Sequence, residues 1–153
     1  MADTSLNENR LALLIWQTSN LWQSKVRQKL KESEITLNEY LILETIYLLQ
    51  QKNTNITQKD ICINASIDRS VVSLRVSNLE EKKLILKLQP KDKRSDSLIL
   101  TEAGNELINN IINNIVELEN ELFNKLGSEI FNFTNSLKLL LGKKIRIRAK
   151  LND

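Results

Sequence analysis

The residues of this sequence that could act on a charged partner gather in two short stretches. One stretch carries four charged side chains in succession, Lys91, Asp92, Lys93 and Arg94. A cluster of cations attracts phosphates, and a narrow DNA minor groove draws in an arginine because its negative potential is enhanced. The alternative is a solvated turn whose cations have no particular partner. The chemistry that this stretch offers is electrostatic.

The other stretch combines small hydroxyl groups with apolar methyl groups, and both can contact the edges of bases. Serine can hydrogen-bond to a donor or to an acceptor, and valine can touch the methyl group of thymine. Arginine and the first amides of a helix suit phosphates. The candidate DNA contacts are Arg69, Ser70, Val71, Ser73, Leu74 and Ser77, preceded in the chain by Thr57, Gln58 and Lys59. The alternative is that the serines only fill the surface.

Two short helices are predicted to position these residues. Thr57 and Asp68 are plausible N-cap residues, because side chains of these types accept hydrogen bonds from the first amides of a helix. Ile56 and Ile61 flank the first cap as a hydrophobic staple would. Residues 64–66 leave room for a turn between the two helices. This spacing predicts a helix-turn-helix.

Two strand-like runs, residues 84–88 and 97–100, follow the helix pair and enclose the charged stretch. The polar residues 89–96 between them predict a hairpin loop whose tip stays in solvent. A hairpin that follows a helix-turn-helix makes a winged helix. We therefore expect residues 36–100 to form a winged helix-turn-helix domain that binds DNA.

Long apolar stripes precede and follow this domain. A first helix is predicted from about residue 6 to about residue 31, and Thr36 with Glu39 forms the pattern of a capping box that starts a second helix. Thr101 begins a long helix with an apolar seam, and Gly127 with Ser128 predicts a break before a last helix. The apolar stripes of these helices are too long to be buried by a domain of this size. A second copy of the chain is the simplest partner that could bury them.

We therefore expect a mainly α homodimer with a small antiparallel β wing. Residues 1–35 and 128–153 make a helical dimerisation lobe, and residues 101–127 form the helix that connects it to the winged helix. Four aromatic residues could line a pocket between the two lobes for a small aromatic effector, although aromatic residues at helical spacing are more often plain core. They are Trp16, Trp22, Tyr40 and Tyr47.

The composition argues against an enzyme. The 153 residues carry a net charge of +3, with one cysteine and no histidine, which removes the commonest general base and metal ligand. There is no Gly-rich phosphate loop, and neither a cofactor nor a metal is expected. Cys62 is interpreted as a small core residue of a protein in the reducing cytoplasm. No apolar run approaches the ~18 residues of a membrane span.

Several motifs resemble, in order and spacing, the MarR (multiple antibiotic resistance regulator) family of transcription regulators. They are residues 56–61, 67–73, 79–85, 91–95 and 98–104. The resemblance implies a homodimer on a pseudo-palindromic duplex, with recognition helices in successive major grooves and wings in flanking minor grooves. It implies that Arg94 enters the minor groove and that Asp92 orients it. Many such proteins repress nearby genes and release DNA when a small aromatic acid binds or a cysteine is oxidised.

The sequence departs from this family pattern in and just after the recognition helix. Leu74 stands where relatives often have a basic residue, Asn78 replaces a frequent arginine, and Lys83 replaces a glycine that commonly ends the helix. The base contacts of relatives therefore cannot be carried over directly. The alternative function is a winged-helix module that binds protein, or an anti-regulator without DNA binding, and the basic wing with Arg94 argues against it.

Overall fold

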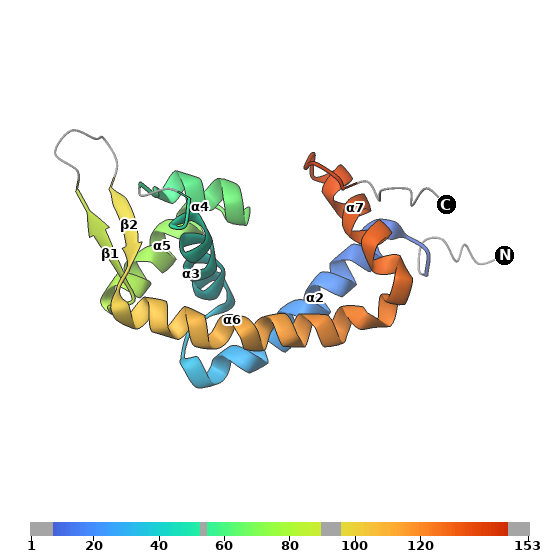
Figure 1. Cartoon of the computed structure of the whole chain (residues 1–153), viewed down its shortest axis with the longest axis horizontal. Helices are drawn as coiled ribbons and strands as arrows, with labels where there is room; N and C mark the ends of the chain where they lie inside the picture. Colours follow the sequence, from blue (N-terminus) through green and yellow to red (C-terminus); the bar gives the residue numbers. More distant parts are fainter. Residues whose placement is uncertain (1–7, 53–54, 90–95, 147–153) are drawn as a thin grey trace, which may run out of the picture. The chain divides into compact units, whose positions relative to one another are not determined.

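The computed structural model describes residues 8–52, 55–89 and 96–146, and most of them are helical (Figure 1). The elements in chain order are α2 (Leu11–Leu30), η1 (Lys31–Ser33), α3 (Leu37–Leu49), α4 (Gln58–Ala65), α5 (Arg69–Glu81), β1 (Ile85–Leu88), β2 (Ser97–Leu100), α6 (Glu102–Phe123), η2 (Asn124–Glu129) and α7 (Ile130–Leu140). The chain divides into two compact units, one ending at Val116 and the other beginning at Glu117. The prediction of a mainly α chain with a small antiparallel hairpin is confirmed.

The core of the first unit lies among α3, α4 and α5. Each of the three helices contacts the other two, so that α5 is held from two sides. Burial of apolar area provides the free energy for this packing, at roughly 25 cal/mol per Å². The fully buried side chains are Ile42, Leu43 and Ile46 of α3, Ile61 of α4, and Val72, Val76 and Leu79 of α5.

The predicted start signals of α3 and α4 are confirmed. Thr36 and Glu39 form a capping box, in which the Glu39 amide donates to the Thr36 hydroxyl at 3.2 Å and the Thr36 amide donates back to the carboxylate at 3.4 Å. Thr57 and Asp60 form a second capping box at the start of α4. Asp68 occupies the N-cap position of α5, as predicted, but its side chain makes no capping hydrogen bond.

The hairpin is joined to the helix-turn-helix by the backbone. Its strands pair antiparallel, with Ile85 opposite Leu100. The Leu98 amide donates to the carbonyl of Ile56, just before α4, at 2.7 Å. The hairpin therefore lies beside the first helix of the pair, and the winged helix predicted from the sequence is confirmed.

A close backbone contact joins the hairpin to α6. The Thr101 amide donates to the Leu84 carbonyl at 3.0 Å, and the Thr101 hydroxyl donates to the Lys83 carbonyl at 2.7 Å. The same hydroxyl accepts from the Gly104 amide at 3.0 Å, so Thr101 caps α6 as predicted. Gly104 lies so close to Leu84 that a Cβ would overlap its carbonyl oxygen. The glycine of the Leu-Thr-Glu-Ala-Gly sequence is thus required by packing.

The predicted apolar stripe of α2 is only partly covered within a single chain. Val26 and Leu30 near the end of the helix are buried, whereas Leu11 and Trp16 are 65% and 64% exposed. Exposed apolar side chains of this size are unusual when they lie together on one helix. No helix in the described part of the chain is long and apolar enough to cross a membrane.

The second unit contains the end of α6, η2 and α7. Gly127 has a φ of 53°, a positive value that glycine adopts without steric cost. It interrupts the helical backbone between α6 and α7, as predicted. Ser128 does not cap α7, because Glu129 occupies the N-cap position. A small apolar hollow of about 270 Å³ has Leu126, Phe133 and Leu137 among its lining residues.

Replacement of Gly104 by alanine tests the contact between β1 and α6. The added methyl group would overlap the Leu84 carbonyl oxygen, and backbone atoms cannot move aside as a flexible side chain can. We expect Gly104→Ala to lower the free energy of unfolding by about 2 kcal/mol or more, as overpacking does. Urea unfolding followed by circular dichroism measures it, with Ala103→Ser at the exposed neighbouring position as the control. Equal stability of the two variants would contradict the close approach.

Candidate nucleic-acid interface

Helix α5 presents one face to the core and the opposite face to solvent. Val72, Val76 and Leu79 are buried, and they hold the helix against α3 and α4. Residues three and four positions apart lie on the same face of a helix. On the opposite face, four exposed residues follow this spacing and form what we call the outward stripe. They are Ser70, Leu74, Ser77 and Glu81.

The structure brings five of the predicted contact residues near the outward stripe or onto it. Ser70, Leu74 and Ser77 belong to the stripe itself, whereas Val71 and Ser73 lie on its two sides, half-buried and exposed respectively. The Ser77 hydroxyl donates to the Ser73 carbonyl at 3.1 Å, so its oxygen remains available as an acceptor. The helix therefore offers hydroxyl oxygens and apolar methyl groups to solvent, as its sequence predicts.

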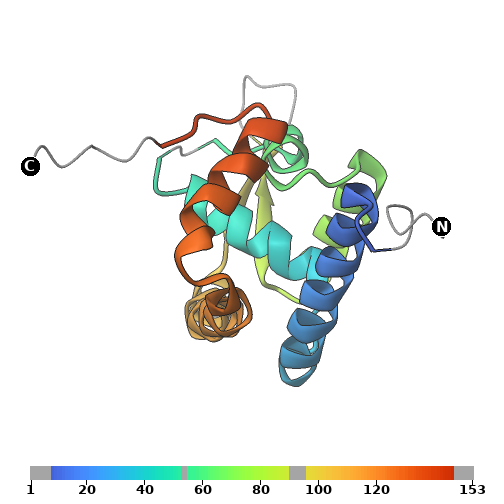
Figure 2. The same cartoon turned by 90° about the vertical axis from the view of Figure 1, so that its right-hand side faces the viewer.

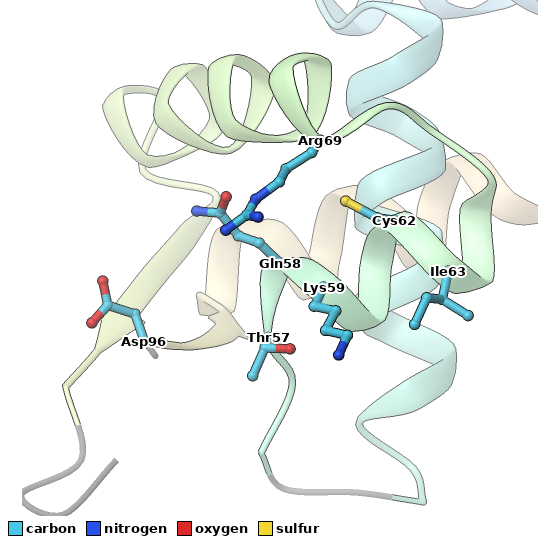
Figure 3. Close-up of a pocket in the computed structure, with 7 residues that line it drawn as sticks. All are labelled: Thr57, Gln58, Lys59, Cys62, Ile63, Arg69 and Asp96. Atoms are coloured by element: carbon cyan, nitrogen blue, oxygen red, sulfur yellow. The ribbon is translucent and has the colours of Figure 1, made fainter. Parts of the chain in front are cut away.

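The remaining described candidates surround a hollow of about 620 Å³ at the start of the helix pair. Figure 3 shows Arg69, from the first turn of α5, extending towards Gln58 on α4. Thr57 and Lys59 come from the same end of α4, and Lys59 and Arg69 are both exposed. Two cations from different helices thus line one hollow at the edge of the helix-turn-helix, and the carboxylate of Asp96 lines it as well.

Cys62 also lines this hollow. Its side chain is half-buried, and the interpretation of Cys62 as a core residue is therefore only partly right. The residue lies on α4 directly after Ile61, which is fully buried, so it sits at the margin of the core. Within the described residues, no group of three or more histidine, cysteine, aspartate or glutamate residues is placed to hold a metal ion.

The charged residues of the wing, Lys91, Asp92, Lys93 and Arg94, lie outside the described residues. Their predicted contacts to DNA stay predictions. The structure places the strands that lead to them, and the amide of Leu98 in β2 donates to the carbonyl of Ile56, just before α4.

The four aromatic residues predicted to line an effector pocket occupy different environments. Tyr40 is buried in the core of the first unit, Trp16 is exposed, and Trp22 and Tyr47 are half-buried. None of them lines the hollow beside α4. None lines a second hollow of about 520 Å³ either, which lies beside Lys82 and the start of α6. The effector pocket stays a prediction.

A buried carboxylate ties α5 and its end to α3, and the sequence analysis did not predict this contact. Glu39 is only 1% exposed, and its Oε2 accepts from the Lys82 ammonium at 2.9 Å. Lys82 also donates to the carbonyl of Glu34 at 2.8 Å. Glu39 was identified from its capping pattern alone, because a pattern within one helix does not show which cations another helix brings to it.

Arg75 is the second cation that faces Glu39. Its Nη1 lies 3.8 Å from the Glu39 Oε1, and its Nε is buried without a hydrogen-bond partner among the described residues. An arginine in the middle of α5 is thus drawn towards the α3 side of the helix and away from the outward stripe. We call Glu39 with Arg75 and Lys82 the Glu39 cluster.

The end of α5 has a geometry that usually selects glycine. Lys83 has a φ of 60°, the left-handed conformation, which costs a residue with a side chain roughly 1–2 kcal/mol. The Leu84 amide donates to the Leu79 carbonyl and the Lys83 amide to the Glu80 carbonyl, both at 3.0 Å. This pair of bonds is a Schellman motif. The departure from glycine that the sequence shows at this position is therefore accommodated without a change in the helix end.

Comparison with known proteins shows that the chain is similar to transcription regulators. No family model matches the sequence. The uncharacterised HTH-type transcriptional regulator YdcH of Bacillus subtilis is 32% identical over 96 residues, which cover 62% of this chain and 65% of YdcH, slightly less than two thirds of its length. The structure of a complex of MepR from Staphylococcus aureus with DNA matches with a TM-score of 0.78 at 28% identity, over 89% of this chain and 97% of MepR.

A second similar structure is only 15% identical in sequence, so it supports the fold alone. It is a MarR-family transcriptional regulator from Rhodococcus sp., with a TM-score of 0.78 over 92% of this chain and 98% of that protein. The helix pair, the hairpin and these similarities define the chain as a winged helix-turn-helix protein. In fold and in sequence pattern it resembles the MarR-type regulators, which confirms the predicted resemblance. The similar proteins are transcription regulators, in agreement with the prediction that the chain is not an enzyme.

Replacement of Glu39 by glutamine tests the Glu39 cluster. Glutamine keeps the capping hydrogen bond that a capping box needs but removes the charge that Lys82 and Arg75 face. Both cations are partly exposed, so we expect Glu39→Gln to lower the free energy of unfolding by only about 1–2 kcal/mol. Urea unfolding measures the loss. The control is Glu80→Gln at an exposed position of α5, and an equal effect of the two changes would show that the cluster contributes nothing specific.

Proposed function

We propose that the protein is a sequence-specific DNA-binding transcription regulator of the MarR type, and that it acts in the cytoplasm as a homodimeric repressor. The observation that carries this proposal is the outward stripe of α5, an exposed helix face on a helix-turn-helix with cations at its edge. The likeness to MepR, a regulator solved in complex with DNA, supports the same function.

The geometry suits a division of contacts between bases and phosphates. A recognition helix enters the major groove with its first residues at the base edges, so Ser70, Val71 and Leu74 are the base contacts in this proposal. Arg69 and Lys59 line the hollow at the edge of the helix pair, where they would face a phosphate. The wing residues around Arg94 would reach the flanking minor groove.

The proposed homodimer rests on apolar side chains that a single chain leaves exposed. On α2 these are Leu11, Leu14, Ile15, Trp16 and Leu21, and at the end of α7 they are Leu139, Leu140 and Leu141. In each unit, exposed apolar residues that follow one another along a helix mark a contact surface, and a second copy of the chain is the simplest partner because most oligomers are symmetric homodimers. Two copies would place two recognition helices on the two halves of a pseudo-palindromic site, with half-sites about one helical turn apart.

We also propose that a small aromatic effector regulates the protein. Trp16 is exposed in the single chain, so a second chain that covers α2 would supply the other wall of such a pocket. An effector in such a pocket would alter affinity for DNA by favouring one spacing of the two winged helices over another. Release of DNA would then lift repression.

A charge reversal on the outward stripe tests the DNA interface. Ser70→Glu places a carboxylate where base acceptors and phosphates would lie, and a like-charge contact costs several kcal/mol. We expect at least about a tenfold loss of affinity for a duplex selected from a random pool, measured by fluorescence anisotropy. Arg94→Ala in the wing should weaken binding as well, because it removes the predicted minor-groove contact.

Ser136→Glu on α7 adds the same charge at an exposed position and is the matched control. It should bind as the wild type does. The affinity of the wild type should also fall steeply with salt, with a log-log slope of roughly −0.9 per neutralised phosphate. Equal affinities of Ser70→Glu and Ser136→Glu, or binding that does not depend on salt, would favour the protein-binding alternative.

Charges on the exposed apolar residues test the dimer. Ile15 and Leu140 are 42% and 69% exposed, so Ile15→Glu combined with Leu140→Glu should leave a single chain folded while preventing association. Sedimentation equilibrium should give the mass of a dimer for the wild type and of a monomer for this variant. Leu48→Glu, at a position of α3 that is 51% exposed, should remain dimeric. A double variant that keeps the mass of a dimer would place the interface elsewhere.

A further inference from the structure

The outward stripe of α5 has an unusual composition for a surface that meets nucleic acid. Its centre is Leu74, which is 57% exposed, with Ser70 one turn before it and Ser77 one turn after it. The only charged residue of the stripe is Glu81 at the end of the helix. An exposed leucine, rather than a cation, is therefore the side chain that projects from the middle of the helix.

Two of the cations in and just after α5 pair with Glu39, and a third lines the hollow beside α4. Arg75, next to Leu74 in the chain, is drawn to Glu39, with 3.8 Å between its Nη1 and the carboxylate. Lys82, just after the helix, donates to the same carboxylate at 2.9 Å. Arg69 lines the hollow beside α4. The strong contact that arginine or lysine makes with the O6 and N7 acceptors of guanine thus has no donor on the described outward stripe.

We propose that Leu74 is a specificity-determining residue that recognises the 5-methyl group of a thymine in each half-site. This inference rests on the proposed function and adds to it the chemistry of the preferred base pair. The Glu39 cluster contributes by keeping Arg75 turned away, so that the leucine is not displaced from the groove by a neighbouring charge.

The choice of thymine follows from what the major groove offers an apolar side chain. The 5-methyl group of thymine is the apolar contact that the four standard bases present there, whereas the other groups are hydrogen-bond donors and acceptors. Leucine packed over a donor or acceptor would remove it from water without giving it a partner, and that costs free energy. Leucine packed over a methyl group removes two apolar surfaces from water together. The flanking serines accept either polarity and do not oppose this choice.

The expected effect of a single methyl group is modest and measurable. Burial of one methyl-sized group changes an equilibrium constant by about fourfold, given roughly 0.8 kcal/mol per group. Loss of the methyl at both half-sites of a duplex should therefore weaken binding by about fifteenfold if the two contacts are independent.

The test is a uracil scan of a duplex selected from a random pool by the full chain. Each thymine is replaced in turn by uracil, which removes the 5-methyl group and leaves base pairing unchanged. For the wild type we expect about a fourfold loss of affinity at one thymine in each half-site, measured by fluorescence anisotropy. For Leu74→Ala we expect uracil and thymine at that position to bind equally, because alanine is too short to reach the methyl group.

Leu48→Ala, another exposed leucine on a different helix, is the matched control and should keep the sensitivity of the wild type to uracil. Circular dichroism should show all three proteins equally folded, since neither leucine belongs to the core. A uracil effect that persists in Leu74→Ala would trace it to the shape of the duplex and overturn the inference. Selected duplexes that bind specifically without any uracil effect would also overturn it, while the proposed function would stand. If no sequence were enriched, the proposed function itself would fail.

Discussion

The carboxylate of Glu39 is the polar interaction that, together with the buried apolar face of α5, sets how this helix lies against α3. A buried charge without partners would cost far more than a small domain can spare. Here the charge is balanced by the Lys82 ammonium, by the more distant Arg75 guanidinium and by the amide of Thr36. Since Arg75 and Lys82 belong to α5 and its end, whereas Glu39 begins α3, this balance favours the same rotation of α5 about its axis as the burial of its apolar face. The set of side chains that faces solvent is thereby fixed.

The described cations of the winged helix therefore lie at its periphery and not on the outward stripe of α5. Lys59 and Arg69 lie at the edge of the helix pair, and the predicted cations of the wing are carried by the hairpin. The middle of α5 is neutral on its exposed side. In the proposed function, cations at the periphery provide affinity that does not depend on sequence, and the neutral stripe provides discrimination between base pairs. Such a separation allows the preferred site to change through one or two exposed residues without loss of overall affinity.

Local signals in the sequence predicted most of the fold. The capping boxes at Thr36 and Thr57 lie within three residues of chain, and their hydrogen bonds form as expected. The strand pair and the cap of α6 could be predicted in the same way, because each depends on residues that lie close together in the sequence. The predicted contact residues of α5 do lie exposed on or beside one face, because the helical period alone decides that.

Features that depend on tertiary contacts were not predictable in the same way. The partners of Glu39 come from a helix more than thirty residues later in the chain, at Arg75 and Lys82. Asp68 has the right type for a capping side chain but makes no such bond, and Cys62 lies at the edge of the core rather than inside it. In each case the pattern gave the residue's place on its helix, and the packing of other helices decided its contacts.

The junction of the hairpin with α6 has a mechanical consequence. The base of the hairpin packs directly on the first turn of α6, a helix of 22 residues. The contact is made by the hydrogen bond from the Thr101 amide to the Leu84 carbonyl and by the close approach of Gly104 to Leu84. Figure 2 looks almost along this helix, which is continuous from end to end. Because backbone packs directly on backbone at this junction, the base of the hairpin and the first turn of α6 can change position only as one piece.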